Sequence, residues 1–156
     1  MSVAKQFEKN VAEQIKQSGR FIMRLNDSPF PGAFNICDYI GYEYPHMYCF
    51  EMKTCETPSL PIKNISEGQY FGLLNAEQYG IIAGILVWWI NHDVSKFISM
   101  HEVIDIEKTR KSIPHDTEYG ITIEGTKKHK YFMYNWDKFF KEVGNGSIQY
   151  KQNASS

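Results

Sequence analysis

The sequence has few cysteines and lacks a long apolar segment. Its three cysteines, Cys37, Cys49 and Cys55, form no CxxC pair, so we expect small buried thiols in a reducing compartment, and no disulfide framework. The opening MSVAKQFEKN lacks the apolar core of a signal peptide, and the longest apolar run, residues 79–90, is shorter than the ~20 residues that span a bilayer. These absences predict a cytoplasmic protein with no membrane partner.

The chain also lacks an excess of charge of either sign. It has 17 Lys and Arg against 18 Asp and Glu, a formal net charge of −1, so the total does not indicate a polyanionic partner. Basic residues are nevertheless concentrated in two places, one near the start of the chain and one near residue 128. The two groups are Lys5, Lys9, Lys16, Arg20 and Arg24, and Lys127, Lys128, His129 and Lys130.

The length and composition fit a single folded domain. A chain of 156 residues can bury roughly two-thirds of its unfolded surface without a metal or disulfide to hold it together. We expect one domain over residues 1–143. Residues 144–156 are rich in Gly, Asn, Ser and Gln and are expected to fray.

Hydrophobic periodicity predicts an α/β fold with a central mixed sheet flanked by helices. In the segment at 80–90, odd-numbered and even-numbered residues are both apolar. This is expected for a central strand that is covered on both faces. Helices are expected at 3–17, 67–78, 103–111 and 136–143. Strands are expected at 20–25, 34–40, 47–55, 80–90 and 96–100, with shorter candidates at 121–123 and 130–134, and 112–120 is expected to be a loop.

Three charged residues lie in the hairpin predicted over 34–55. Alternation along the strand places Glu51 and Lys53 on one face, and the partner strand brings Asp38 beside them. Two interpretations are open. The first is an ion pair on a solvated face, which needs no function. The second is a Mg²⁺ site in which the two acids supply hard oxygen ligands and the lysine orients water or offsets charge on a phosphate.

The spacing D-x12-E-x-K resembles the core of the PD-(D/E)xK nucleases. Four segments, FEKNVAEQI, CDYIGYEYPHMYCFEMKT, LPIKNISEGQ and GIIAGILVWW, resemble successive segments of the RecU family of Holliday junction resolvases in order and spacing. The resemblance implies a restriction-endonuclease-like nuclease core, Mg²⁺ or Mn²⁺ as cofactor, and a homodimer that acts on branched DNA such as a four-way junction. It also implies that the catalytic residues are Glu8, Asp38, Glu51, Lys53 and Gln69, with Glu8, Asp38 and Glu51 as metal ligands.

Several of these residues have a structural alternative. Glu8 would be an ordinary surface glutamate, although it borders the buried stripe of its helix. Gln69 has capping-box spacing from Ser66, which accounts for it without catalysis. His46 and Cys49 have no second pair at zinc spacing, so zinc is not expected.

The DNA-binding residues we predict are Arg20, Arg24, Phe30, Lys127, Lys128 and Lys130. Residues 127–130 would otherwise be a solvated hairpin turn. RecU proteins carry an inserted stalk where this chain has only about 26–35, and there Phe30 and Phe34 would either stack on unpaired bases or anchor the loop. Three functions stay open: a junction resolvase, a less selective nuclease acting on duplex, flap or branched DNA, and a non-catalytic DNA-binding protein.

Overall fold

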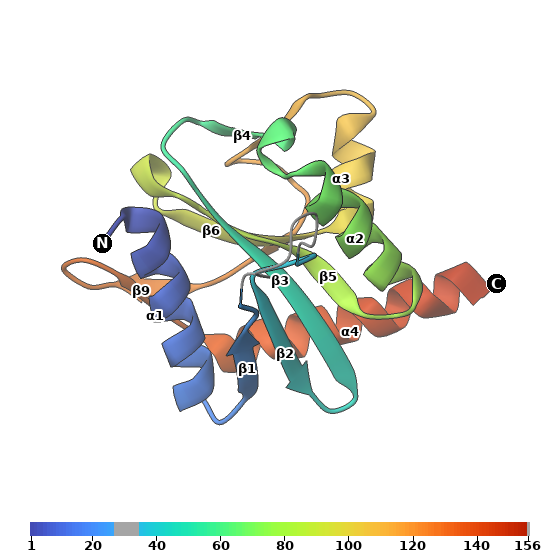
Figure 1. The fold of residues 1–156 in the computed structure, drawn as a ribbon, viewed down its shortest axis with the longest axis horizontal. Helices are drawn as coiled ribbons and strands as arrows, with labels where there is room; N and C mark the ends of the chain where they lie inside the picture. Colours follow the sequence, from blue (N-terminus) through green and yellow to red (C-terminus); the bar gives the residue numbers. More distant parts are fainter. Residues whose placement is uncertain (27–34, 156) are drawn as a thin grey trace.

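A six-stranded mixed sheet forms the centre of the molecule, in the order β1-β2-β3-β5-β6-β8 (Figure 1). The structure is a computed structural model and describes residues 1–26 and 35–155. β3 and β5 are parallel, and the other neighbours in this sheet are antiparallel. The strands are β1 (Phe21–Arg24), β2 (Tyr39–Glu43), β3 (His46–Cys55), β5 (Ile82–Trp89), β6 (Val94–Ser99) and β8 (Ile121–Thr122).

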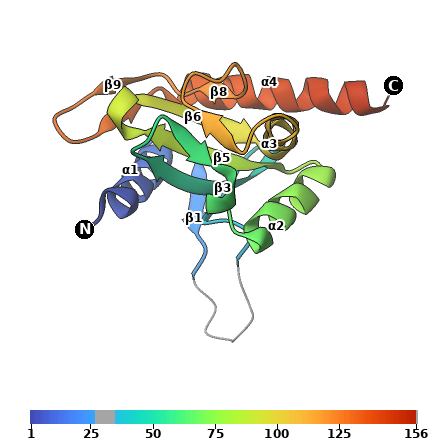
Figure 2. The ribbon, with the colours of Figure 1, turned by 90° about the horizontal axis from the view of Figure 1, so that it is seen from above.

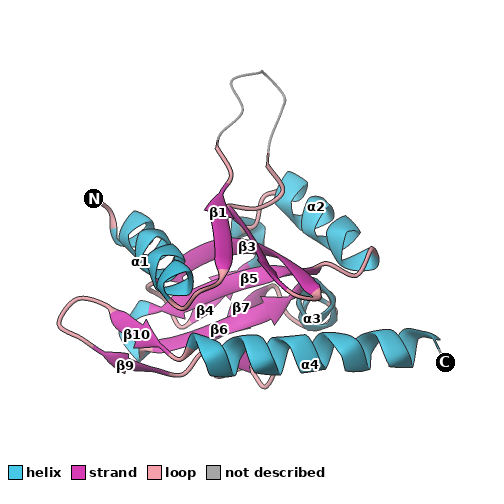
Figure 3. Ribbon diagram, turned by 90° about the horizontal axis from the view of Figure 1, so that it is seen from below, coloured by secondary structure: helices cyan, strands magenta, loops and turns pink. Residues whose placement is uncertain are grey.

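Helices cover both faces of this sheet, which confirms the predicted α/β class. Figure 2 shows α4 along one side of the sheet and α2 on the other, and Figure 3 shows the helices around the strands. The helices are α1 (Val3–Gln17), α2 (Glu67–Gln78), α3 (Met100–Glu107) and α4 (Trp136–Ser155), with short 3-10 turns η1 (Ile62–Asn64) and η2 (Ile90–His92). Within the described residues, no helix is both long and apolar enough to cross a membrane.

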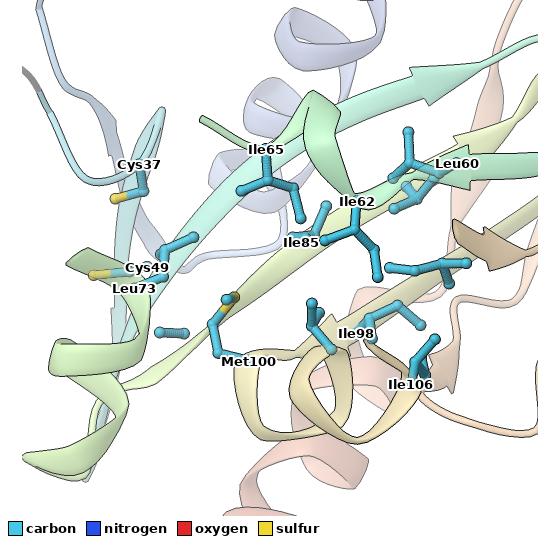
Figure 4. Close-up of a cluster of buried hydrophobic side chains, with 14 of the residues drawn as sticks. Cys37, Cys49, Leu60, Ile62, Ile65, Leu73, Ile85, Ile98, Met100 and Ile106 are labelled. Carbon is cyan, nitrogen blue, oxygen red and sulfur yellow. The ribbon is translucent and has the colours of Figure 1, made fainter. Parts of the chain in front are cut away.

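Each face of the sheet has its own apolar core. Side chains of α1 and α4 pack on one face, where aromatic rings such as Phe50, Phe97 and Phe139 contact one another. Side chains of α2 and α3 pack on the other face, where aliphatic residues such as Leu73 and Ile85 dominate (Figure 4). All but one residue of β5 are buried, as predicted for a strand whose two faces are both apolar.

Two further strand pairs lie outside the main sheet. β4 (Ser59–Pro61) pairs with β7 (Ser112–Pro114), and β9 (Gly125–Lys127) pairs with β10 (Phe132–Tyr134), both antiparallel. The predicted loop at 112–120 therefore contains a strand. Its partner lies more than fifty residues away in the chain, a distance over which local patterns carry no information.

The two helices predicted at 3–17 and 67–78 have the expected bounds. The strand predicted at 34–40 has the wrong bounds, because β2 begins only at Tyr39 and continues through Gly41 to Glu43. Gly41 pairs with both Ile22 and Tyr48, so it lies inside the ladder and not in the turn.

The third helix begins earlier than predicted, at Met100 and not at 103. Ser99 and Glu102 form a capping box there: the side chain of Glu102 accepts a hydrogen bond from the backbone N of Ser99. The last helix also differs, since α4 continues to Ser155 past the predicted end at 143. The glycines at 144 and 146 favour the end of a helix. Gly144 is nevertheless buried, and a Cβ atom at this position would lie 3.4 Å from the ring of His46.

Candidate active site

β3 presents its two faces as the sequence predicts. Tyr48, Phe50 and Met52 are buried in the core formed with α1 and α4. Cys49 belongs to the core formed with α2 and α3, and alternation places Glu51 on that same face. Glu51 is therefore an ionisable residue at the level of a hydrophobic core, and its side chain is 3% exposed.

Asp38 directly precedes β2 and is held against β3 by its backbone and its side chain. Its backbone N donates a hydrogen bond to the carbonyl of Phe50 at 3.1 Å, and its carbonyl accepts one from Leu25 at 2.9 Å. Its Oδ2 accepts a hydrogen bond from the backbone N of Met52 at 3.0 Å. Since Tyr39 pairs with Phe50, these bonds place the Asp38 carboxylate beside Glu51.

Glu51 has one paired and one unpaired oxygen. Nζ of Lys53 lies 3.1 Å from Oε1 of Glu51. Oε2 is buried and has no hydrogen-bond partner in the described chain. Burial and the negative charge of Asp38 raise the pKa of Glu51 to about 7, although Lys53 acts in the opposite direction.

Glu8 lies at the margin of this group, on α1. Burial and then the charge of Asp38 raise the pKa of the Glu8 carboxyl, while Arg24 and Lys53 act to lower it. These effects show that Glu8 is near enough to Asp38 and Lys53 to sense their charges, and its role as a metal ligand stays a prediction.

A divalent cation fits the pair formed by Asp38 and Glu51. Over residues 1–26 and 35–146, no set of three or more His, Cys, Asp or Glu is arranged to hold a metal ion. Two carboxylates, one with a buried oxygen that lacks a partner, suit a hard cation that keeps several waters and takes its remaining ligands from a phosphate. They do not suit a structural zinc ion, which is held by a closed set of four Cys or His ligands.

A basic groove of about 670 Å³ adjoins Glu8 on the outer side of α1. It is bounded by α1 and β1, with Tyr39 at its floor. Four cationic side chains line it, Lys5, Lys9, Lys16 and Arg24, together with the acids Glu8 and Glu13. Oε1 of Glu13 lies 4.0 Å from Nζ of Lys9. All of the first basic group except Arg20 thus borders this groove.

A family model for recombination protein U (RecU) matches residues 26–134, which is most of the chain. This chain belongs to the RecU family. The matched region contains Asp38, Glu51, Lys53 and Gln69 but not Glu8. The restriction-endonuclease-like core is also found in the 1.6 Å structure of Archaeoglobus fulgidus Hjc, a Holliday junction resolvase from an archaeal hyperthermophile. The two folds superpose with a TM-score of 0.53 at 16% sequence identity, over 78% of this chain and 93% of that chain. A comparison with curated protein sequences gave no match.

Gln69 has a structural role in this RecU-family chain. Its backbone N donates to Oγ of Ser66 at 3.2 Å, and its Oε1 accepts from the backbone N of Ser66 at 3.3 Å. This capping box begins α2. The part that Gln69 plays in catalysis stays a prediction.

Arg20 is occupied by the fold. Its Nε lies 2.9 Å from Glu43 and its Nη1 lies 2.7 Å from Asp137, and its guanidinium stacks over the ring of Phe140. These contacts link β1 and β2 to α4. Arg20 therefore has a structural role, and its predicted contact with DNA stays a prediction.

The second basic group lies on the hairpin formed by β9 and β10. Lys127 forms an ion pair with Asp93 at 2.7 Å, and Lys128 and Lys130 are exposed. Phe30 and Phe34, which the sequence suggested as base contacts, lie outside the described residues.

Some features of the site have no signal in the sequence. The hydrogen bond from Met52 N to Asp38 uses a backbone group, which any residue supplies. The three cysteines are free and buried, as expected, but the thiol of Cys49 raises the pKa of Cys37 through a hydrogen bond beside the acidic pair. Figure 4 shows these two sulfur atoms at one end of the aliphatic core.

Proposed function

We propose that this RecU-family chain is a divalent-metal-dependent endonuclease that resolves four-way DNA junctions in recombination by hydrolysing phosphodiester bonds. The observation that carries the proposal is Glu51: one oxygen pairs with Lys53, the other is buried without a hydrogen-bond partner among the described residues, and the charge of Asp38 raises the pKa of this carboxyl. A buried carboxylate oxygen without a partner or ligand, such as Oε2 of Glu51, costs free energy. The fold shared with a Holliday junction resolvase supports the same conclusion.

The side chains of the site have separate tasks in this proposal. Asp38 and Glu51 hold Mg²⁺ or Mn²⁺, with Glu8 at the margin as a further ligand, through water or directly. When bound, such a cation polarises a phosphoryl oxygen and lowers the pKa of a coordinated water. Lys53 leaves Oε1 of Glu51 to orient the attacking water or to offset the charge that develops on the phosphate.

Ionisation of Glu51 controls whether the site is ready to bind a cation. With a pKa of about 7, this carboxyl is partly protonated at neutral pH without a cation. A ligand must be deprotonated to bind a metal, so cation binding would release a proton here. Cation affinity should therefore rise with pH through neutrality.

The groove along α1 gives the substrate strand a path to this site. Lys5, Lys9, Lys16 and Arg24 would contact backbone phosphates there. The exposed hairpin lysines Lys128 and Lys130 would extend this surface. The net charge of the chain is −1, but contact with DNA depends on where the charges lie, and cations are concentrated along this groove.

We also propose a homodimer as the active form. A four-way junction presents two equivalent strands for cutting, and a twofold assembly would place one site on each. The ends left by symmetric nicks would be suitable for ligation.

One feature of the sequence favours a second candidate, a less selective nuclease on duplex, flap or branched DNA. Only about 26–35 occupy the place of the stalk that RecU proteins insert. The chemistry at Asp38 and Glu51 would be the same in both cases.

A cleavage assay separates the two candidates. A synthetic four-way junction and a linear duplex of the same sequence are incubated with the protein, with Mg²⁺ omitted and then restored. The proposal predicts paired nicks in the junction, slow or no cutting of the duplex, and no cutting without the cation. Equal rates on both substrates would support the less selective nuclease, and cleavage without any divalent cation would contradict both.

A further inference from the structure

A second hollow, of about 290 Å³, lies on the other side of α1 from the basic groove. It is enclosed by α1, the end of β5 and the hairpin of β9 and β10. The two hollows share no lining residue. It is therefore a separate site, and the proposed catalytic chemistry does not use it.

Aromatic rings form the walls of this hollow. Trp88 and Phe132 meet edge to face, with their ring centroids 6.1 Å apart. Phe132 stacks on Tyr134 at 5.7 Å with an interplanar angle of 17°. Tyr131 is 40% exposed at the rim. A planar ring that entered here would find aromatic faces and edges at van der Waals distance.

Polar groups without partners accompany these rings. Gln6 is exposed and Asn10 is half-buried, and both line the hollow. In the chain apart from 27–34 and the last ten residues, their side-chain amides make no hydrogen bond to the protein, so they are open to water or to a ligand. Trp88 also lines the hollow, and its buried Nε1 has no partner among the described residues. Such a donor is normally satisfied. Lys130 adds a positive charge at the rim.

These features together describe the ligand. Aromatic walls favour a flat, conjugated group, unpaired amides favour one with donors and acceptors on its edge, and a lysine at the rim favours an attached phosphate. A volume of about 290 Å³ is at the lower end of small-ligand sites, which suits one base and excludes a helix or a folded partner. A nucleobase on a DNA strand combines all four properties.

We propose that this hollow binds a single unstacked nucleobase of the DNA strand that is being cut. Tyr131 and Phe132 would stack on the base, Gln6 and Asn10 would contact its edge, and Lys130 would contact its phosphate. The inference rests on the proposed nuclease function and adds a substrate feature to it. Four-way junctions and flaps supply unstacked bases at the branch at a lower cost than an intact duplex does.

The lining of this hollow contains neither Asp38 nor Glu51. The captured base should therefore belong to a different nucleotide from the phosphate held at these two acids.

Binding to junctions with one abasic site tests this proposal. The abasic site is moved along the cut strand, one nucleotide at a time, and affinity is measured with Asp38→Asn protein so that the DNA stays intact. We expect loss of the base at one position away from the cut to weaken binding about tenfold, as is typical of one base stacked on an aromatic ring. Other positions should have little effect.

Gln6→Trp in the same background fills the hollow from an exposed position on α1. This substitution should abolish the difference in affinity between positions of the abasic site. Gln78→Trp, the same change at the exposed end of α2, should retain it. Tyr131→Ala removes a rim ring and should reduce the position effect, so the test does not depend on one variant.

The outcomes distinguish the two claims. If Asp38→Asn protein binds the junction tightly but with no dependence on the position of the abasic site, the base pocket is wrong and the nuclease proposal stands. A position effect that survives unchanged in Gln6→Trp also overturns the pocket. If the Asp38→Asn protein does not bind branched DNA at all, the proposed function fails and the pocket with it.

Discussion

Nζ of Lys53 lies 3.1 Å from Oε1 of Glu51, two residues away on the same face of β3. The other oxygen of that carboxylate is buried and has no hydrogen-bond partner in the described chain. The two interpretations of the charged strand are therefore compatible. The ion pair neutralises one side of Glu51, and the other side stays available to a cation that Asp38 would share.

Asp38→Asn should remove cleavage and leave the fold intact. Asparagine keeps an oxygen that can accept the hydrogen bond from Met52 N, but it removes the charge that a divalent cation needs. We expect the cleavage rate to fall by at least about a hundredfold, as is typical when one electrostatic group of an active site is lost. Single-turnover cleavage of a junction in Mg²⁺ measures this. Asp116→Asn, at an exposed position, is the matched control, and equal losses in both variants would refute the assigned site.

The stability of the metal-free protein should depend on Glu51. Its carboxyl ionises near 4.5 in the unfolded chain and at about 7 in the folded one. Between these values the folded protein holds a proton that the unfolded chain has released, so stability falls as the pH rises through this range. Glu51→Gln removes the titration. Relative to the wild type, it should gain on the order of 2–3 kcal/mol between pH 5 and pH 8.

Urea denaturation at the two pH values, with EDTA present, checks this difference. Glu118→Gln, an exposed carboxylate, should follow the wild type. An identical pH dependence in Glu51→Gln and wild type would show that Glu51 is not a buried, protonatable group. Saturating Mg²⁺ should restore the stability of the wild type at pH 8 and should have no such effect on Glu51→Gln.

Lys53→Met should change both the rate of cleavage and its dependence on pH. Lys53 acts to lower the pKa of Glu51, so its loss should move the rise of cleavage activity with pH to higher pH, besides lowering the maximal rate. A pH–rate profile of single-turnover cleavage measures both effects. Lys63→Met at an exposed position should leave the profile unchanged. A lower rate with no change in the profile would mean that Lys53 does not act on Glu51.

Charge removal in the basic groove should affect binding and its dependence on salt. Lys5→Gln and Lys9→Gln each remove one cation that lines the groove. Each should weaken junction binding and reduce the slope of log affinity against log salt by about one. Lys141→Gln, an exposed lysine on α4, is the control. An affinity that does not change between low and physiological salt would contradict a phosphate-contacting groove.

The sequence predicted those parts of the site that follow from local periodicity. Alternation along β3 placed Glu51 and Lys53 on one face, and the spacing of Ser66 and Gln69 predicted the cap of α2, because both depend on neighbouring residues alone. The position of Asp38 was expected only from the hairpin. The bond that fixes its carboxylate, to Met52 N, forms in an irregular segment that no pattern specifies.

Features that depend on distant segments were not predicted. The ion pairs of half-buried Arg20 with Glu43 and Asp137 join parts of the chain that local patterns do not relate, so the sequence did not predict this structural role. The hollow beside Trp88 is formed by three separate segments. Its unpaired groups become visible only when these segments are brought together.

Anomalous diffraction from crystals soaked in Mn²⁺ tests the central claim most directly. One Mn²⁺ peak between the carboxylates of Asp38 and Glu51, with ligand distances of about 2.0–2.4 Å and no such peak in Asp38→Asn crystals, is the predicted result. Well-ordered carboxylates without Mn²⁺ between them, while the ion is bound elsewhere on the same chain, would contradict the account.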